Sequence, residues 1–330
     1  MSKDYHHLSM VQRCHIYVLL KRGLSQREIA QEVGCSQSTV SREVARNRGS
    51  RGYRYKQAHE KALIRRRKTG ANAKKLNAEL IQLMTHLLCE YQWSPEQISG
   101  RLKQTHKLLI SHETIYRYIR EDRKKGGKLY KHLRRKGKKY KKIKGKVAGR
   151  GVIPNRVDIE ERPEIVDEKV RCGDFEIDLI VGKRHKGNIV SIVDRVSKVT
   201  RLTLINQATA ANTAQAVIQQ LSPFAGDIHT ITSDNGKEFA NHQDIAGKLK
   251  AQFFFAKPYH SWERGLNENT NGLVRQYFPK GTDFTTITEP EVKYVEYLLN
   301  SRPRKTLNFN TPIETFYRLT KRNLNYALRC

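Results

Sequence analysis

The chain has 330 residues, enough for two or three domains with cores of their own, and a formal net charge of +31 from 63 Lys and Arg against 32 Asp and Glu. Residues 1–150 hold 38 basic and 11 acidic side chains (net +27), whereas residues 151–330 hold 25 and 21 (net +4). This asymmetry favours a polyanion-binding part joined to a nearly neutral one, although a ribosomal-type or membrane-surface protein would also be basic. The five scattered Cys include no C-x-x-C pair and no apolar run approaches ~20 residues, which argues against a disulfide framework, a structural zinc site and a membrane span.

The first predicted elements are three short helices. Apolar residues at helical spacing over 8–20 predict a helix that ends near Gly23. Ser25 and Ser36 are suitable N-caps for two further helices, with the turn between them at Gly34. Two short capped helices around a glycine turn are typical of a helix-turn-helix, although an ordinary helical hairpin with a polar face would share the pattern. In the helix-turn-helix interpretation, the outer face of the second helix offers to base edges and phosphates the side chains of Gln37, Ser38, Ser41, Arg42 and Arg46.

A weaker pattern of the same kind spans residues 93–120. Ser94 and Ser111 are N-cap candidates, and the outer face of the second helix includes Arg117 as a candidate DNA contact. This module could equally serve packing or dimerisation. Residues 123–150 then hold 15 Lys or Arg and no acid. Such a block favours an extended linker that neutralises phosphates, although a nuclear-localisation signal has a similar composition.

The neutral half changes to a pattern of strands and helices. The order is three strands, helix, strand, helix, strand, helix, which is that of the ribonuclease-H-like fold, a mixed α/β sheet with helices on both faces. The strands are predicted at 175–182, 187–195, 199–205, 228–236 and 251–256, and helices are placed at 209–221 and 265–278. We therefore expect all-α helix-turn-helix modules at 1–56 and 57–122, a basic linker at 123–160 and an α/β catalytic domain at 161–330.

The strand over 175–182 raises a question, because Asp174, Glu176 and Asp178 point to one face of it. Unpaired buried carboxylates are costly. Asp234 lies at the C-terminal end of another strand, where ligands and metals commonly meet in open sheets. If the two strands are neighbours, Asp178 and Asp234 converge and repel each other unless a cation lies between them. Magnesium suits hard oxygen ligands, and two ions ~3.5–4 Å apart can hold the attacking and leaving phosphate oxygens, so the sequence predicts a metal site.

A third ligand is expected from the helix over 265–278. Glu268 shares a helical face with Asn271 and Arg275, at i+3 and i+7. Asn271 is a supporting candidate, and Arg275 could reach a phosphate beside the metals.

Other side chains compete for roles near this site. Asp174 and Glu176 are alternatives to Asp178, and the other interpretation of Asp174 is a solvated residue at the start of its strand. Glu263 is an alternative to Glu268, although it pairs naturally with Arg264. The remaining assignments are Asp194 as a hairpin-turn residue, His260 as a DNA contact or a structural hydrogen-bonding group, Asn235 as an orienting group for Asp234 or a turn cap, and Phe253–Phe255 as core.

Several segments together resemble the DDE transposases of the bacterial insertion sequence thirty family. They are FEIDLIVG, TSDNGKEFA, PYHSWERGLNENTNGLVRQYFPKGTDF, RPRKTLNFNTP and, in the helix-turn-helix, SREVARN. The 33 residues between Asp234 and Glu268 match the spacing in that family, and the resemblance covers nearly the whole chain. In the first motif, Phe175 and Ile177 stand where family members often have Trp and Gly, which affects the packing but not the aspartate.

The resemblance implies that Asp178, Asp234 and Glu268 bind two Mg²⁺ ions, with Mn²⁺ as a possible substitute. The enzyme would nick double-stranded DNA at the terminal inverted repeats of its element and join the ends to target DNA, without a covalent protein intermediate. Pairing two ends implies at least a homodimer, and the expected location is the cytoplasm, at the bacterial nucleoid. The alternatives are a DNA-binding regulator with a catalytically silent oligomerisation domain, disfavoured by the intact carboxylates, and a retroviral-type integrase, disfavoured by the lack of a His/His/Cys/Cys pattern.

Overall fold

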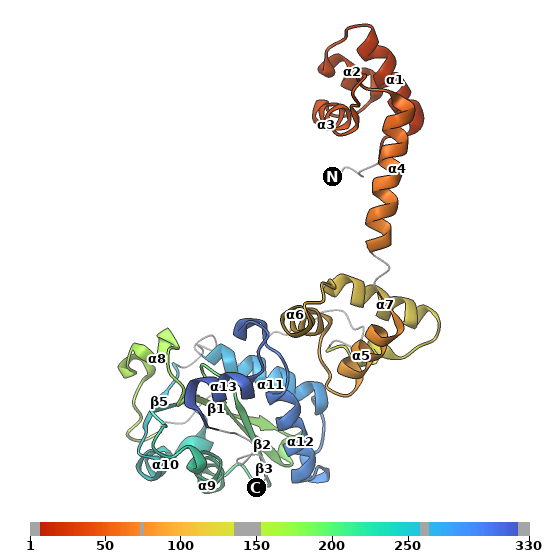
Figure 1. Ribbon diagram of the computed structural model, residues 1–330. Coiled ribbons are helices and arrows are strands. Elements are labelled where there is room, and N and C mark those ends of the chain that lie inside the picture. The colour runs from red at the N-terminus through yellow and green to blue at the C-terminus, as the bar shows by residue number, and fades with distance from the viewer. Residues whose placement is uncertain (1–6, 73–75, 135–152, 258–263, 323–330) are drawn as a thin grey trace. The chain divides into compact units, whose positions relative to one another are not determined.

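The computed structural model describes residues 7–72, 76–134, 153–257 and 264–322. The chain divides into two compact units, Met1–Ile81 and Gln82–Cys330. The first unit is helical, and the second contains further helices followed by a mixed sheet (Figure 1).

The first unit has the predicted helix-turn-helix. Its helices are α1 (Met10–Lys21), α2 (Gln26–Val33), α3 (Gln37–Asn47) and α4 (Tyr55–Asn72). Ser25 caps α2 in a capping box with Glu28, and Ser36 caps α3 by accepting from the Thr39 amide. Gly34, between α2 and α3, has φ of +71°, a left-handed conformation that glycine adopts without steric cost. The predicted N-caps of α2 and α3 and the glycine turn between them are therefore confirmed.

A buried ion pair fixes α3 to α1. Arg13 Nε donates to Glu43 Oε1 at 2.8 Å, and the two side chains are only 7% and 10% exposed. Asn47 Nδ2, at 2.7 Å, and the Tyr53 hydroxyl, at 3.3 Å, also donate to Glu43 Oε1. Because a buried charge requires partners, this network sets how α3 sits on the core formed by Ile16, Ile29, Val33 and Val40.

The helices of the second unit begin with α5 (Ala78–Cys89), α6 (Pro95–His106) and α7 (His112–Lys124). Ser94 and Ser111 cap α6 and α7 as predicted. The buried residues of these two helices include Ile98, Leu102, Ile115 and Ile119. The division into units differs from the predicted domain boundaries. Residue 56 lies inside α4, which packs against α1. The boundary in the sequence between the two units falls within α5, after Ile81.

The start of the predicted basic linker is not extended. Helix α7 continues to Lys124, and Leu129–His132 forms a turn of 3₁₀ helix. The Leu129 amide donates to Asp122 Oδ2 at 3.1 Å, and the Arg123 guanidinium lies 4.4 Å from the centre of the Tyr130 ring. These local partners fold the first residues of the basic block. Residues 135–152, which hold much of the predicted linker, lie outside the described part of the chain.

The mixed sheet has the strand order β3-β2-β1-β4-β5. Strands β1, β2 and β3 are antiparallel neighbours, whereas β4 pairs parallel with β1, and β5 pairs parallel with β4. Three antiparallel strands followed by two parallel ones on the other side of β1 form a ribonuclease-H-like sheet, as predicted. The strands are β1 (Asp174–Val181), β2 (Asn188–Asp194), β3 (Thr200–Ile205), β4 (Thr230–Ser233) and β5 (Gln252–Phe255).

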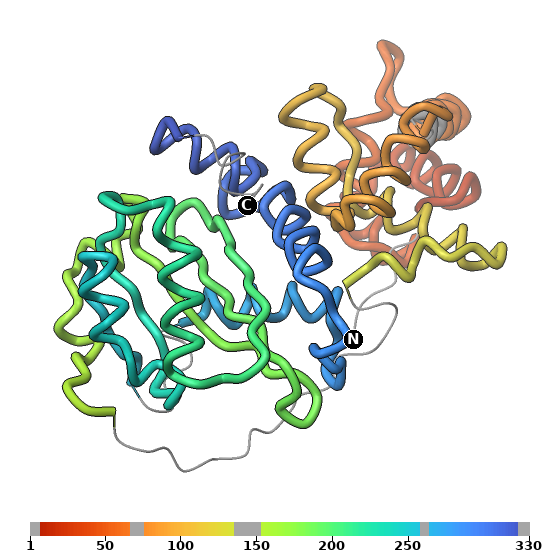
Figure 2. The backbone as a smooth tube through the Cα atoms, turned by 90° about the horizontal axis from the view of Figure 1, so that it is seen from below, coloured from red at the N-terminus to blue at the C-terminus, as the bar shows by residue number. Residues whose placement is uncertain are grey.

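Helices cover both faces of this sheet (Figure 2). On one face, α9 (Ala210–Leu221) and α10 (His242–Leu249) enclose a core that contains Phe175, Ile177 and the predicted core residues Phe253 and Phe255. On the other face, α11 (Gly265–Tyr277) and α12 (Glu289–Asn300) pack against Ile180 and Leu202. Strand β1 is thus covered on both sides, and its even-numbered residues face α11. The short α8 (Ile165–Glu168) precedes the sheet and α13 (Pro312–Thr320) follows it.

Candidate active site

The pairing of β1 with β4 places Asp178 and Asp234 close together. The parallel register pairs Asp174 with Thr230 and Glu176 with Thr232, so continuing it by two residues brings Asp234 opposite Asp178. Asp234 follows the last residue of β4, and its Oδ1 accepts from the Gly236 amide at 2.9 Å. The two strands and the turn after β4 therefore hold the two carboxylates at one edge of the site.

A single guanidinium contacts both carboxylates. Arg264 Nη1 lies 3.7 Å from Asp178 Oδ1, and Arg264 Nη2 lies 3.4 Å from Asp234 Oδ2. The same Nη1 donates to the Ile177 carbonyl at 2.9 Å. Burial raises the pKa of Asp178, Arg264 opposes that shift, and the neighbouring charge of Asp234 adds to it. The carboxylates are thus close enough to repel each other, and a positive group already lies against both.

Helix α11 directs one face towards Asp178. Asn271 Nδ2 donates to Asp178 Oδ2 at 2.7 Å, and Asn271 Oδ1 accepts from the Ser191 hydroxyl of β2 at 2.9 Å. Glu268 lies three residues before Asn271 and four after Arg264, which puts its Cα on the same helical face as these two contacts. Its side chain is exposed and has no hydrogen bond or ion pair within the described part of the chain.

These residues fit a divalent cation in donor chemistry. Carboxylate oxygens are the hard ligands that Mg²⁺ prefers, and Asp178 and Asp234 already share a cationic partner. Glu268 does not join them in this conformation: among the residues that the structure describes, no three His, Cys, Asp or Glu side chains gather closely enough to hold a metal ion. The geometry therefore brings together two of the three predicted ligands and leaves the third on the adjoining helix face.

The other two acids of β1 are tied to protein partners. Asp174, expected to be solvated if it is not a ligand, is only 2% exposed; it accepts from Arg171 Nε at 3.0 Å and from the Thr230 hydroxyl at 2.8 Å. Glu176 is 3.3 Å from Arg195 Nη1 and accepts from the Asn267 amide near the start of α11 at 3.2 Å. The row of negative charge on β1 thus divides into two structural acids and Asp178.

Comparison with known proteins identifies the chain. Residues 4–47 match a helix-turn-helix domain model, and residues 52–119 match a homeodomain-like domain model. The transposase for insertion sequence element IS4351 of Bacteroides fragilis is 46% identical over 98% of both chains. The transposase InsI for IS30A of Escherichia coli is 36% identical over 94% of this chain and 84% of its own length, and the transposase for IS1086 of Cupriavidus metallidurans is 32% identical over 94% of each.

The chain belongs to the insertion sequence thirty family of transposases. It is a DDE-type enzyme that cuts DNA and transfers strands, and membership of this family implies the use of a divalent metal ion. Among solved structures, the catalytic core domain of BIV integrase matches at 19% identity with a TM-score of 0.35, over 44% of this chain and 94% of that one. At that TM-score the match adds nothing to the fold assignment, which rests on the strand order.

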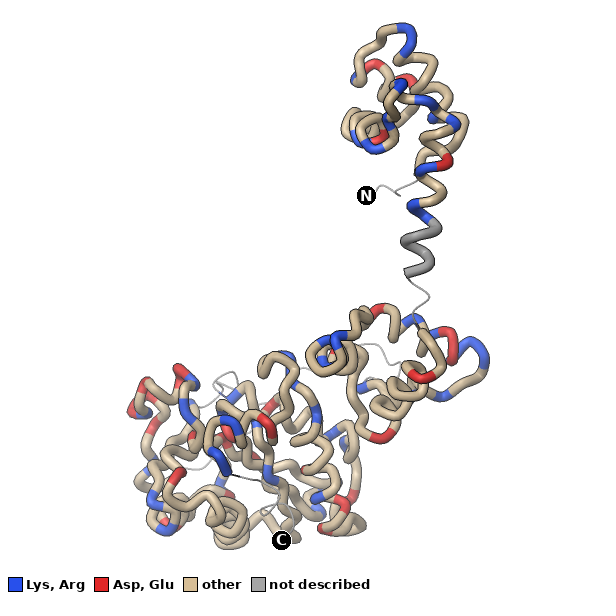
Figure 3. The backbone as a smooth tube through the Cα atoms, viewed as in Figure 1, with Lys and Arg blue, Asp and Glu red and all other residues tan. Residues whose placement is uncertain are grey.

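The helix-turn-helix of the transposase exposes the predicted DNA-reading face. Along α3, Ser41 is partly exposed, and the exposed candidates are Gln37, Ser38, Arg42 and Arg46. Arg42 Nε donates to the Ser38 carbonyl at 2.9 Å, so its guanidinium lies along the outer side of α3. Lys and Arg occur on both α3 and α4 (Figure 3). In the second unit, Arg117 is also exposed on α7. The helix-turn-helix match supports DNA binding by this region.

Two predicted site residues, the supporting candidate Asn235 and the DNA-contact candidate Arg275, have partners within the protein. Asn235 Nδ2 donates to the Ala256 carbonyl at 2.6 Å, and its Oδ1 accepts from Arg156, so it joins the ends of β4 and β5 instead of orienting Asp234. Arg275 Nη2 donates to the Val181 carbonyl at 2.7 Å, and burial lowers the pKa of its guanidinium. It therefore fixes α11 to the end of β1.

The remaining predicted residues divide into one that is confirmed and two that cannot be placed. Asp194 is a turn residue of the β2–β3 hairpin, accepting from the amides of Val196 and Ser197 at 3.1 and 2.6 Å. His260 and Glu263 lie outside the described residues. The contact that sequence reasoning missed is that of Arg264, which it assigned to Glu263. Its signal was the helical spacing, since Arg264 precedes Glu268 by four positions and Asn271 by seven.

None of the helices that the structure describes is long and apolar enough to cross a membrane. The transposase therefore offers no helical membrane span within those residues.

Proposed function

We propose that Asp178, Asp234 and Glu268 hold two Mg²⁺ ions, for which Mn²⁺ can substitute, and that the transposase uses them to cut the terminal inverted repeats of its element and join the ends to target DNA. One observation carries this proposal: the Arg264 guanidinium lies within 4.0 Å of both aspartates. A cationic group shared by two carboxylates supports a site at which they share divalent cations.

The protein's own residues prepare this site. Asn271 orients Asp178 by its 2.7 Å hydrogen bond, and the Gly236 amide orients Asp234. Arg264 neutralises the two aspartates and competes with any other cation for them. When bound, the metal ions would supply an activated water or DNA 3′-hydroxyl and neutralise charge on the phosphate oxygens.

The DNA-binding part of the proposal assigns base reading to α3. Gln37, Ser38, Ser41, Arg42 and Arg46 would contact the terminal repeat, and Arg117 on α7 would contact phosphate. Two element ends have to be held together during strand transfer, which favours a homodimer or higher oligomer acting in the cytoplasm, at the nucleoid.

The test is a cleavage assay on a supercoiled plasmid that carries the terminal repeats, with Mg²⁺ or Mn²⁺. We expect three variants to lose nicking but still to protect the repeats in a footprinting assay. They are Asp178→Asn, Asp234→Asn and Glu268→Gln. Asp244→Asn, the same change on the exposed side of α10, is the matched control and should cut like the wild type. Identical products from the wild type and Asp234→Asn would overturn the assignment. A wild type that footprints the repeats but never cuts them would support the regulator alternative.

A further inference from the structure

A polar pocket lies beside the carboxylate site, on the same side of the sheet. It has a volume of about 480 Å³ and is bordered by Gly265 and Leu266 at the start of α11. Glu176 of β1 also lines it, two residues before Asp178. At ~3.3 Å per residue along a strand, the pocket begins ~7 Å from Asp178, which is about two base-pair steps of rise along a duplex axis.

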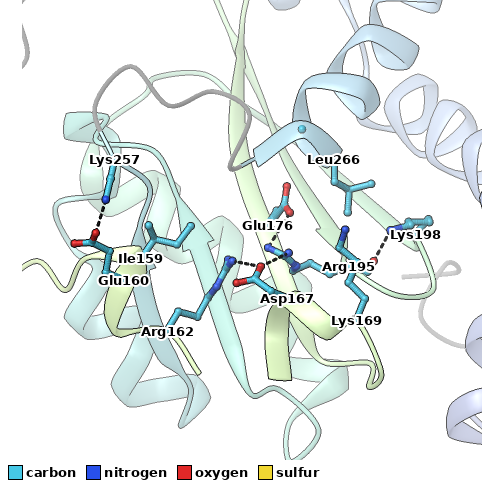
Figure 4. A pocket seen from close by; sticks show the side chains of 11 residues that line it. Ile159, Glu160, Arg162, Asp167, Lys169, Glu176, Arg195, Lys198, Lys257 and Leu266 are labelled. Carbon is cyan, nitrogen blue, oxygen red and sulfur yellow. Dashed lines mark hydrogen bonds and ion pairs between the residues drawn. The ribbon is translucent and has the colours of Figure 1, made fainter. Parts of the chain in front are cut away.

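Positive charge exceeds negative charge in this pocket. Three carboxylates line it, those of Glu160, Asp167 and Glu176. Five cationic side chains oppose them, those of Arg162, Lys169, Arg195, Lys198 and Lys257, which gives a net charge of +2 (5 − 3). Figure 4 shows two of the arginines directed at Asp167, and Lys257 paired with Glu160 away from them.

Each carboxylate of the pocket already forms an ion pair with an arginine or with Lys257. Asp167 Oδ1 accepts from Arg162 Nη2 at 2.6 Å and from Arg195 Nη2 at 2.9 Å. Lys169 and Lys198, the two remaining lysines, form no ion pair among the described residues. Lys198 Nζ donates only to a backbone carbonyl, that of Arg195, and Lys169 has no hydrogen bond or ion pair among the described residues. Burial and then repulsion by Lys169 lower the pKa of Lys198.

The buried arginines also have guanidinium N–H groups that lack a hydrogen-bond acceptor among the described residues. The Arg195 side chain is only 5% exposed, yet among the described residues its Nε has no hydrogen-bond acceptor, and its Nη1 has only the ion pair with Glu176 at 3.3 Å. Arg162 Nε is likewise buried without an acceptor in that part of the chain. Leaving a buried charged donor unsatisfied is costly. Unsatisfied guanidinium donors beside two lysines without acidic partners are the groups that a phosphate oxyanion satisfies, because guanidinium and ammonium groups form strong, charge-assisted hydrogen bonds to phosphate.

We propose that this pocket binds a backbone phosphate of the DNA strand held at the catalytic centre, a phosphodiester different from the one that is cut. The proposal rests on the carboxylate site proposed above, because that site sets which strand passes the pocket. Lys169 and Lys198 supply the unpaired charge, and Arg195 supplies the fixed donors. The pocket thereby sets the register of the strand relative to Asp178 and Asp234.

The first experiment needs no protein variant. Terminal-repeat duplexes carry one neutral methylphosphonate at a time, at each phosphate within about three nucleotides of the cut on either side. With full-length wild type, one position other than the cut should lower the single-turnover cleavage rate by about tenfold or more, as expected for losing a charge-assisted phosphate contact. If no such position exists, the proposal is wrong, and a pocket that takes only free inorganic phosphate would give that result.

The second experiment assigns the sensitive position to the pocket. Lys169→Gln/Lys198→Gln keeps both side-chain stems and should lower the rate on the unmodified duplex by a similar factor, with no further loss from the methylphosphonate at that position. The control, Lys248→Gln/Lys321→Gln, removes the same charge from exposed positions outside the pocket and should behave like the wild type. If the methylphosphonate lowers the rate of the pocket variant as much as that of the wild type, the pocket does not bind that phosphate.

The outcome can be separated from that of the carboxylate proposal. The same duplexes are also compared by binding affinity in metal-free buffer, where no cleavage occurs. The affinity of the wild type should fall at the sensitive position, and that of the pocket variant should not. If Asp234→Asn cuts like the wild type, the carboxylate assignment fails. The affinities measured in metal-free buffer still show whether the pocket binds a backbone phosphate. Equal affinities at all positions in the wild type would overturn the pocket alone.

Discussion

Asn271→Ala tests whether α11 orients the first catalytic aspartate. The Asn271 amide makes the 2.7 Å hydrogen bond to Asp178 Oδ2, and a hydrogen bond to a charged acceptor is worth about 1.5–3 kcal/mol. At 1.4 kcal/mol per factor of ten, the variant should cut about 10- to 150-fold more slowly. The hydrogen bond also favours the ionised form of Asp178, so its loss adds to the burial that already raises the pKa of Asp178. The acid limb of the rate profile should therefore move to higher pH.

The assay is single-turnover cleavage of a terminal-repeat duplex between pH 5.5 and 8.5 (about the range in which a raised carboxylate pKa becomes visible). The control is Ser191→Ala, which removes the hydrogen bonds of the Ser191 hydroxyl to Asn271 Oδ1, at 2.9 Å, and to the Asp178 backbone carbonyl, at 3.4 Å. It leaves the bond from Asn271 to the Asp178 carboxylate in place. It should cut within a few-fold of wild type and keep the wild-type pH profile. The reasoning is refuted if Asn271→Ala keeps the wild-type rate and profile, or if Ser191→Ala reproduces its loss.

Three further predictions follow from buried charges. Glu43→Gln leaves Arg13 buried without its ion pair and should lower the unfolding free energy of the first unit by about 3–5 kcal/mol, measured by chemical denaturation. The double change Arg13→Met/Glu43→Leu should recover most of this loss of stability. If the double variant shows no recovery, the ion-pair argument is contradicted. Asp178→Asn should raise the melting temperature at pH 7, because burial raises the pKa of Asp178 and its ionisation then costs stability as the pH rises through that raised value. The gain should vanish below pH ~4, the ordinary aspartate range, and a lower melting temperature at pH 7 would reverse the inferred sign. Burial and Asp194 raise the pKa of Cys172 to about 12, so at pH 8 it should react with a thiol reagent more slowly than Cys14; equal rates in mass-spectrometric labelling would show that it is not protected.

Much of the fold follows from short-range signals. Ser25, Gly34 and Ser36 define α2 and α3, since caps and a left-handed glycine act within a few residues of chain. The predicted strands and helices of the neutral half lie within a few residues of the observed ones for the same reason. The predicted order includes a helix between β4 and β5, but its residues were not assigned, because the eight residues of α10 follow closely on the turn after β4 and give too short a periodic pattern.

The candidate site was only partly accessible to the same reasoning. Asp178 and Asp234 were paired correctly in space because neighbouring parallel strands end at the same edge of a sheet. The partners of Asn235 and Arg275 were missed, since each bonds to a backbone carbonyl on an element distant in the chain, Ala256 and Val181. A sequence pattern shows which helix face a side chain is on, but it does not show which acceptor lies nearest.

The sequence by itself determined that three acids alternate along β1 and that a glutamate and an asparagine share a face of α11. Only the tertiary structure decided which acid is available for chemistry. Asp174 and Glu176 are buried against Thr230 and Arg195, while Asp178 faces Asp234 across the β1–β4 pair. The physical reason is that a carboxylate's state is set by the charges and donors around it, and in this sheet most of those come from other strands and helices.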